Sequence, residues 1–177
     1  MNMKTGLAAL VTALLLLPGI AQADELPMKA EAPITLTSPS AILCEASTGQ
    51  VIFEKNADER RPVASVNKVM TILLTLEAVD EGRVSLEDQV TVSPRAASMG
   101  GSQAFLDAGE RYKLSELLKT VIVASANDSA VALAEHLAGT EESFVRLMNT
   151  RAEELGLTNT HYANCTGLPA QEHYTTA

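Results

Sequence analysis

Apolar positions form two kinds of pattern along the chain. Short apolar runs at residues 41–46 and 51–54 surround a turn that contains Gly49, and this arrangement is typical of a β-hairpin. After residue 65 the apolar positions recur at intervals of three and four, which predicts amphipathic helices. We therefore expect a mixed domain in which a hairpin precedes a group of helices.

Four helices are predicted from these intervals. They cover residues 65–81, residues 114 up to a turn at 125, residues 128–138 and residues 141–155. The residues expected to face inward in the first helix are Val66, Val69, Met70 and Leu73. The second helix is predicted from apolar residues that repeat at three and four, namely Leu114, Leu117, Leu118, Val121 and Ile122. Gly82 and Gly156 are expected to end helices in the left-handed conformation, and Thr140 to cap the last helix. Residues 98–110 are expected to form a surface connection with one short strand at 104–106.

Ser65 and Lys68 stand where a loop from Arg60 to Pro62 enters the first predicted helix. Residues three apart lie on one face of a helix, within side-chain reach of each other. The positive end of the helix dipole lowers the pKa of an amine in the first turn, and a neutral amine can accept the proton of a hydroxyl. The same dipole favours the oxyanion formed when Ser65 attacks a carbonyl. The pair is a candidate nucleophile with its own base.

A second polar group follows at Ser125, Ala126 and Asn127. It stands between the apolar run 121–124 and the apolar face of the next helix. Polar side chains in such a setting need hydrogen-bond partners. A Ser-x-Asn tripeptide alone is also typical of a turn between core helices, so it is the combination with Ser65 and Lys68 that points to chemistry.

Ser65-x-x-Lys68 followed by Ser125-Ala126-Asn127 resembles the active-site serine penicillin-binding proteins and class A β-lactamases, whose third element is Lys-Thr-Gly. Further segments are similar to the serine-type D-alanyl-D-alanine carboxypeptidases, namely residues 46–49, 62–65, 101–103 and 155–161. The likeness runs from about Pro33 to the last residue. It implies an α/β (α+β) fold of the β-lactamase/transpeptidase type, with a helical cluster packed on an antiparallel sheet. Lys-Thr-Gly is absent from the 177 residues, so we expect an incomplete domain, truncated before the later strands and inactive alone.

The resemblance also implies a role for each site residue. Ser65 is expected to attack the peptide bond between two terminal D-alanines and form an acyl-enzyme, with Lys68 as the base. Ser125 is expected to relay a proton to the leaving amine. Asn127 is expected to orient Lys68 and bind the substrate backbone. The implied partners are a peptidoglycan stem peptide ending in D-Ala-D-Ala and, as covalent inhibitors, β-lactams.

Two alternative functions stay open. A class A β-lactamase deacylates with a glutamate in a Glu-x-x-Leu-Asn stretch, and residues 154–158 come close to it. Glu154 stands at a helix end stopped by Gly156, however, and the asparagine is lacking, which favours a surface glutamate. The other alternative, which the missing third motif permits, is a non-catalytic module that binds cell-wall peptides or penicillin.

Residues 1–23 have the parts of a secretory signal. Lys4 supplies the positive start, residues 7–17 the apolar centre, and Ala21 and Ala23 the small-x-small cleavage site. The apolar stretch is shorter than the roughly 20 residues that span a bilayer. We therefore expect an exported, extracytoplasmic protein, at the cell wall or the outer face of the cytoplasmic membrane.

The three prolines in residues 24–40 predict a linker, which leaves residues 41–177 for the peptidase domain. Membrane association is expected only through a C-terminal segment that this sequence does not contain. With 13 basic and 22 acidic residues, bulk charge argues against nucleic acid as a partner.

The cysteines and histidines suggest no cofactor. Export permits a disulfide between Cys44 and Cys165, and two free thiols agree equally well with the sequence. His136, His161 and His173 lack the spacing of metal ligands, so no metal is predicted.

Overall fold

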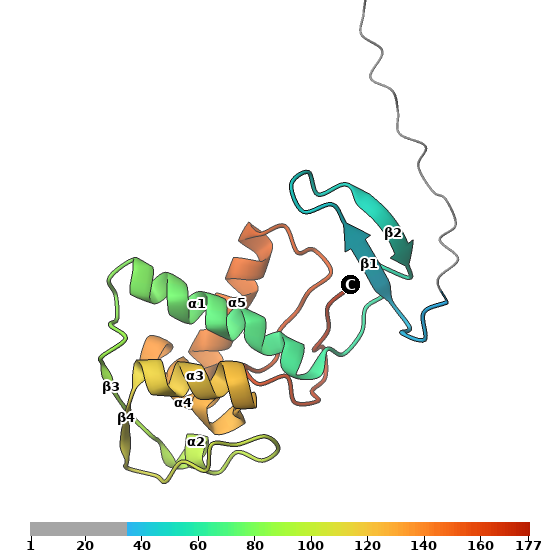
Figure 1. Cartoon of the computed structure of the whole chain (residues 1–177). Helices are drawn as coiled ribbons and strands as arrows, with labels where there is room; N and C mark the ends of the chain where they lie inside the picture. The colour runs from blue at the N-terminus through green and yellow to red at the C-terminus, as the bar shows by residue number, and fades with distance from the viewer. Residues whose placement is uncertain (1–34) are drawn as a thin grey trace, which may run out of the picture. The chain divides into compact units, whose positions relative to one another are not determined.

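The computed structural model describes residues 35–177 (Figure 1). The predicted signal segment and linker residues 24–34 lie outside these residues, and residues 35–40 form neither strand nor helix. In chain order the elements are β1 (Ala41–Cys44), β2 (Val51–Lys55), the 3₁₀ turn η1 (Ala64–Asn67), α1 (Lys68–Asp80), β3 (Gln89–Thr91), α2 (Pro94–Ala97), β4 (Arg111–Lys113), α3 (Leu114–Ala124), α4 (Asn127–Ala138) and α5 (Glu141–Glu154).

The strands form two separate antiparallel pairs. The β1–β2 hairpin was predicted, and its register pairs Ala41 with Lys55 and Leu43 with Phe53. The pairing of β3 with β4 was not predicted, because both strands have three residues and carry too little pattern to be recognised. The strand expected at residues 104–106 is wrong. The backbone amides of Ala104 and Leu106 donate to the buried Asp128 carboxylate instead of to a neighbouring strand.

The three later helices lie close to their predicted bounds. Thr140 caps α5, its side chain accepting a hydrogen bond from the Ser143 amide. Gly82 and Gly156 have positive φ angles of 69° and 74° just beyond the ends of α1 and α5. These caps confirm the predicted ends of α1 and α5 and the start of α5, whereas α1 begins at Lys68, three residues later than predicted.

The predicted inner face of α1 is only partly right, because Met70 is buried and Leu73 packs against the core but the other two residues do not. Val66 and Val69 are 68% and 65% exposed. The buried residues of α1 are Lys68, Met70, Thr71, Leu74, Thr75 and Ala78. The chain forms a 3₁₀ turn up to Asn67, and three polar side chains of α1 find buried partners, so the helix turns a partly polar face inward. Ile122, at the end of α3, is also exposed rather than buried.

Helix α4 lies at the centre of the helical group. Eight consecutive residues, 127–134, are buried, and α4 contacts α1, α2, α3 and α5. A helix that is buried on all sides is typical of a core element. The surrounding core is mainly aliphatic, and its largest fully buried side chains include Phe144, Leu114, Leu117, Leu133 and Met148.

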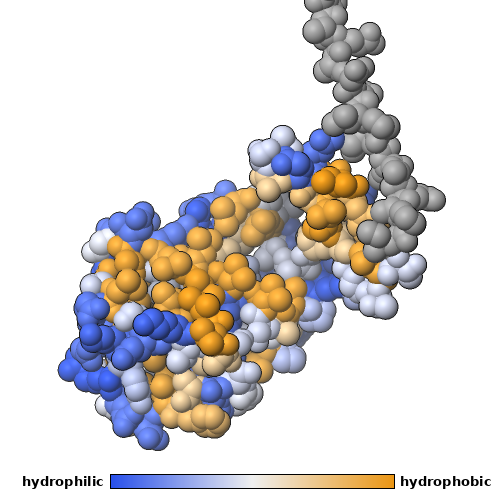
Figure 2. Space-filling view, in the orientation of Figure 1, coloured by the Kyte–Doolittle hydropathy of each residue, from blue (hydrophilic) through white to orange (hydrophobic). Residues whose placement is uncertain are grey.

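Apolar side chains of the β1–β2 hairpin lie at the surface. Ile42, Leu43 and Ile52 are 42%, 54% and 55% exposed. Figure 2 shows apolar surface on this hairpin and a larger area over α1 and α3. Within residues 35–177, no helix is both long and apolar enough to cross a membrane.

Phe144→Ala tests the position of the core. Phe144 is fully buried, so removing its ring should lower the free energy of unfolding by about 3 to 5 kcal/mol. Leu147→Ala, on the same helix at a position 43% exposed, should lower it by about 1 kcal/mol or less. Urea unfolding followed by circular dichroism measures both, and equal losses would contradict this description of the core.

Candidate active site

Ser65 and Lys68 are brought together as predicted. Ser65 lies in η1 and Lys68 is the first residue of α1. The Lys68 Nζ atom donates to Ser65 Oγ over 3.1 Å. The preceding residue, Ala64, has a φ of +45°, an uncommon backbone conformation for a residue with a side chain.

The amine of Lys68 is buried. The residue is 2% exposed, and burial lowers the pKa of the amine below its ordinary value. A negative charge on the Cys165 sulfur would raise the pKa of Lys68 instead. Burial raises the pKa of that thiol well above its usual range, so the thiol stays neutral near pH 7 and the effect of burial on Lys68 dominates. A lowered pKa suits a group that must accept a proton.

A turn at residues 164–168, which the sequence did not predict, completes the surroundings of Lys68. Lys68 Nζ donates to the main-chain oxygen of Thr166 over 2.7 Å. Gly167 makes this approach possible, since a Cβ atom there would lie 1.9 Å from the Ala64 oxygen and its φ is +84°. Gly167 was the only signal in the sequence, because a main-chain carbonyl leaves no trace in residue identity.

Asn127 and Ser125 lie at the junction of α3 and α4. Ser125 ends α3 in the left-handed conformation with a φ of 55°. The Asn127 amide donates to the Gly100 oxygen over 2.7 Å, and its backbone N–H donates to the Ser102 oxygen over 2.7 Å. These bonds hold the 98–103 segment beside Asn127. Within the described residues, neither Ser125 nor Asn127 forms a hydrogen bond with Ser65 or Lys68.

Close glycine contacts connect Asn127 to the nucleophile. A Cβ atom on Gly101 would lie 2.8 Å from Asn127 Nδ2 and 3.9 Å from a methyl group of Leu168. Leu168 directly follows Gly167, which lies against Ala64. The segments that carry Ser65, Asn127 and Leu168 therefore converge, although they are far apart in sequence.

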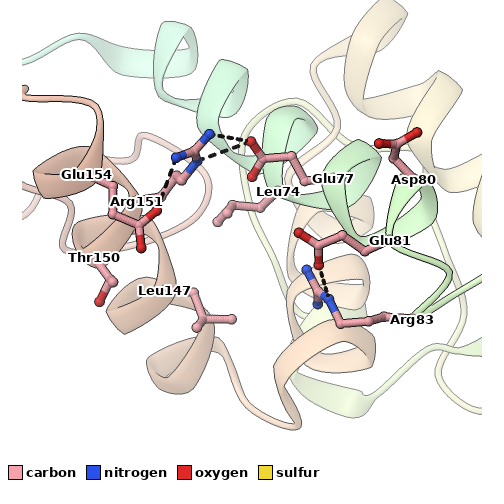
Figure 3. A pocket seen from close by; sticks show the side chains of 9 residues that line it. All are labelled: Leu74, Glu77, Asp80, Glu81, Arg83, Leu147, Thr150, Arg151 and Glu154. Atoms are coloured by element: carbon pink, nitrogen blue, oxygen red, sulfur yellow. Dashed lines mark hydrogen bonds and ion pairs between the residues drawn. The ribbon is translucent and has the colours of Figure 1, made fainter.

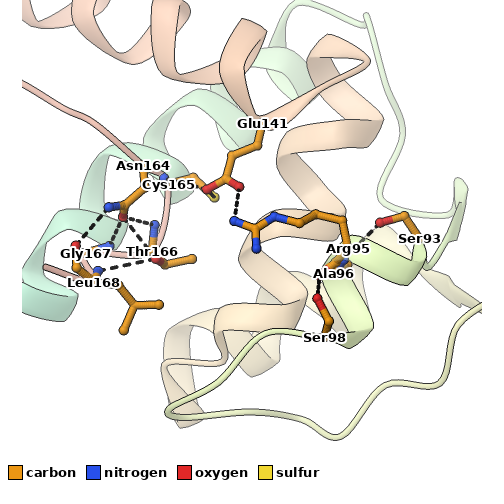
Figure 4. Close-up of polar contacts among 10 residues, drawn as sticks. All are labelled: Ser93, Arg95, Ala96, Ser98, Glu141, Asn164, Cys165, Thr166, Gly167 and Leu168. Atoms are coloured by element: carbon orange, nitrogen blue, oxygen red, sulfur yellow. Dashed lines mark hydrogen bonds and ion pairs between the residues drawn. The ribbon is translucent and has the colours of Figure 1, made fainter. Parts of the chain in front are cut away.

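Both cysteines are free thiols. Cys44 is exposed on β1, whereas Cys165 is fully buried. Figure 4 shows Cys165 between the turn and Glu141, whose carboxylate also pairs with Arg95 over 2.9 Å. The disulfide that the sequence left open is not formed, because Cys165 belongs to the core beside Lys68.

A cavity of about 510 Å³ lies between α1 and α5, apart from this site. Its lining includes neither Ser65 nor Lys68, and its arginines pair with neighbouring carboxylates (Figure 3). Glu154, the glutamate of the β-lactamase alternative, lines this cavity and pairs with Arg151 over 3.0 Å. It therefore lies in surroundings other than those of Ser65.

A serine hydroxyl against a buried lysine amine defines a candidate serine nucleophile with lysine as its base. Residues 27–177 match the peptidase S11 family, described as D-alanyl-D-alanine carboxypeptidase, and the chain belongs to this family. The family resemblance in the sequence is thus confirmed.

Two curated relatives are similar to most of this chain. D-alanyl-D-alanine carboxypeptidase DacF of Bacillus subtilis is 50% identical over 138 residues, which cover 78% of this chain and 36% of the relative. D-alanyl-D-alanine carboxypeptidase DacC of Escherichia coli is 39% identical over 154 residues, which cover 81% of this chain and 38% of the relative. The chain therefore spans well under half the length of these relatives.

Two solved structures confirm the fold class. The D-alanyl-D-alanine carboxypeptidase DacD from Francisella tularensis has a TM-score of 0.81 and 38% identity, over 88% of this chain and 38% of that one. Penicillin binding protein 5 from Haemophilus influenzae has a TM-score of 0.79 and 32% identity, over 82% of this chain and 43% of that one. Within the described residues of this chain, the strands form two two-stranded antiparallel sheets, and two isolated antiparallel bridges join Arg61 to Thr175 and His161 to Tyr174.

Gly167→Ala tests the close approach of the turn to the nucleophile. Gly167 and Gly156 both have positive φ, so alanine strains the backbone at either position by about 1 kcal/mol or more. Only at Gly167 does the new methyl group also meet another segment. Gly167→Ala should therefore cost about 1 to 3 kcal/mol more than Gly156→Ala in urea unfolding. Equal costs would show that the turn does not lie against Ala64.

Proposed function

We propose that the protein is a serine-type D-Ala-D-Ala carboxypeptidase, which removes the terminal D-alanine from peptidoglycan stem peptides through an acyl-enzyme on Ser65. The observation that carries the proposal is the 3.1 Å contact between Ser65 Oγ and the buried Lys68 amine. The family and the names of the relatives support the substrate class. The activity is proposed for the natural full-length protein.

Lys68 acts as the base in acylation. In its neutral form the amine takes the Ser65 proton while Oγ attacks the carbonyl carbon between the two terminal D-alanines. The carbonyl oxygen becomes an oxyanion, which the positive end of α1 favours. When the oxyanion collapses, the C–N bond breaks and the proton passes to the leaving nitrogen. Free D-alanine departs, and the shortened peptide stays esterified to Ser65.

Hydrolysis then completes the cycle. Water attacks the ester carbon and gives its proton to the base, and the bond between this carbon and Ser65 Oγ breaks as Oγ takes a proton back. The products are the regenerated serine and a peptide with one D-alanine fewer. The same two residues therefore serve both halves of the reaction.

Ser125 and Asn127 have supporting roles in this proposal. Ser125 relays the proton from Lys68 to the leaving amine, and Asn127 orients Lys68 and binds the substrate backbone. The family motif supports both roles. The role of Asn127 is also supported by Gly101, which lies near both Asn127 and Leu168 of the turn beside Lys68.

β-Lactams are the proposed covalent inhibitors, because their strained amide can be attacked by Ser65 in place of the peptide. The substrate belongs to the cell wall, so the proposed location is extracytoplasmic. The name of the Haemophilus influenzae neighbour, penicillin binding protein 5, supports the inhibitor class.

Ser65→Ala should abolish labelling of the full-length protein by a fluorescent penicillin, since no other residue is proposed to form the ester. Ser47→Ala, a serine in the exposed β1–β2 turn, should leave labelling unchanged. Gel fluorescence gives the extent of labelling, and mass spectrometry of a digest gives the labelled residue. A label on another serine, or one that survives Ser65→Ala, would refute the assignment.

Acylation should rise with pH through an apparent pKa below the roughly 10.4 of a free lysine, because burial favours the neutral amine. Lys68→Arg should reduce the acylation rate by more than about tenfold, or about 1.4 kcal/mol, because a guanidinium does not lose its proton. Lys119→Arg, on the exposed surface of α3, is the matched control. If Lys68→Arg keeps a rate within about tenfold of the parent, Lys68 only positions the substrate.

A further inference from the structure

Three successive main-chain carbonyls, those of residues 164, 165 and 166, accept hydrogen bonds from side chains of η1 and α1. The donors, in the same order, are Asn67 Nδ2 over 3.3 Å, Thr71 Oγ1 over 2.8 Å and Lys68 Nζ over 2.7 Å. The last carbonyl is the one that contacts the base. The turn thus forms one wall of the Lys68 environment, and its hydrogen-bond acceptors in this wall are main-chain carbonyls.

The side chain of Asn164 organises this turn. Its Oδ1 atom accepts from the Thr166 amide over 3.1 Å, from the Thr166 hydroxyl over 3.0 Å and from the Gly167 amide over 2.7 Å. Its Nδ2 atom donates to the Leu168 oxygen over 2.9 Å. Figure 4 shows these bonds converging on the asparagine amide. One half-buried side chain therefore ties down the segment that contains the Thr166 carbonyl.

We propose that Asn164 is a positioning residue for acylation: its amide shapes the turn that presents the Thr166 carbonyl to Lys68, and this carbonyl directs the Lys68 lone pair toward Ser65. The inference rests on the proposed role of Lys68 as the base.

The chemistry of a neutral amine gives the reason. Such an amine has two N–H bonds and one lone pair, and the lone pair must face the hydroxyl from which it takes a proton. An N–H group of Lys68 donates to Thr166 O, so rotation about the last side-chain bond is restricted. The remaining direction is then available to Ser65 Oγ, 3.1 Å away. Without a fixed carbonyl the amine loses this orientation, and water can enter beside it.

Few titratable groups act on Lys68. In the described part of the chain the Cys165 thiol acts on the pKa of Lys68, and burial keeps this thiol neutral. The Glu141 carboxylate acts on the thiol, with its Oε1 3.5 Å from Cys165 Sγ. Asn164 carries no charge, so its replacement by alanine changes the geometry and hydration of Lys68 but adds no new charge.

Asn149 provides a matched control. It is also half-buried, and its amide also binds the backbone of the same loop, through two bonds with Tyr162 over 2.9 and 2.8 Å. None of its hydrogen bonds in the described part of the chain is with the turn residues 164–168. Asn149→Ala therefore loosens the loop in a similar way without removing the support of the Thr166 carbonyl.

The experiment measures acylation of the full-length protein by a fluorescent penicillin across pH, together with thermal melts. Asn164→Ala should slow acylation at neutral pH by about tenfold or more and move the rising limb of the profile to higher pH, because Lys68 becomes hydrated. Asn149→Ala should lower the melting temperature but keep the pH profile. If Asn164→Ala does not fold, Asn164→Ser, which keeps a shorter acceptor, is measured in its place.

A parental pH profile in the Asn164 variant, or the same shift in both variants, would overturn the proposal. Absence of labelling in the parent protein would instead contradict the proposed function. In that case Lys68 is acetylated with acetic anhydride at a series of pH values, and mass spectrometry measures the extent of acetylation. This assay reports the titration of Lys68 and requires no substrate. The acetylation midpoint should rise in the Asn164 variant and not in Asn149→Ala, and an unchanged midpoint would refute the role of Asn164.

Discussion

The buried amine of Lys68 is the constraint on which the rest of the site depends. Burying a polar group is costly unless it is hydrogen-bonded, and Lys68 is nearly inaccessible to water. Its partners are Ser65 Oγ, one helical turn away, and the Thr166 carbonyl, 98 positions later in the chain. The first partner makes Lys68 a candidate base. The second requires the turn at residues 164–168 to lie against the start of α1.

Close backbone approach makes that return possible. Gly167 lies against the main chain of Ala64 at a distance that no side chain can share. Gly101 lies beside the side chain of Asn127, where a Cβ atom would be 2.8 Å from Nδ2. Helix α4 then ties these segments to the core, because its first turn holds both the 98–103 loop and the Asp128 contacts to residues 104–106. The site is thus assembled from loops whose positions are set by one buried helix.

The apolar surface of the chain has a different distribution from the one that helical periodicity suggests. Val66 and Val69 face outward, next to the nucleophile, while polar Thr71 and Thr75 are buried. Thr71 satisfies its hydroxyl on the Cys165 carbonyl and Thr75 on the carbonyl of Thr71. The hydrogen-bonding needs of the turn, rather than hydrophobicity alone, therefore determine how α1 is rotated about its axis.

Local chemistry in the sequence was enough to predict helices α1, α3, α4 and α5, the caps of α1 and α5, and the Ser65–Lys68 pair, but not the short helix α2. Helical spacing, Thr140 before α5 and the glycines after α1 and α5 act over a few residues, and so does the reach between positions three apart. The buried face of α1, the strands β3 and β4, the free Cys165 and the Thr166 contact came only from the tertiary structure. They depend on main-chain carbonyls and on segments brought together from far apart, and neither is encoded in the identity or spacing of neighbouring residues.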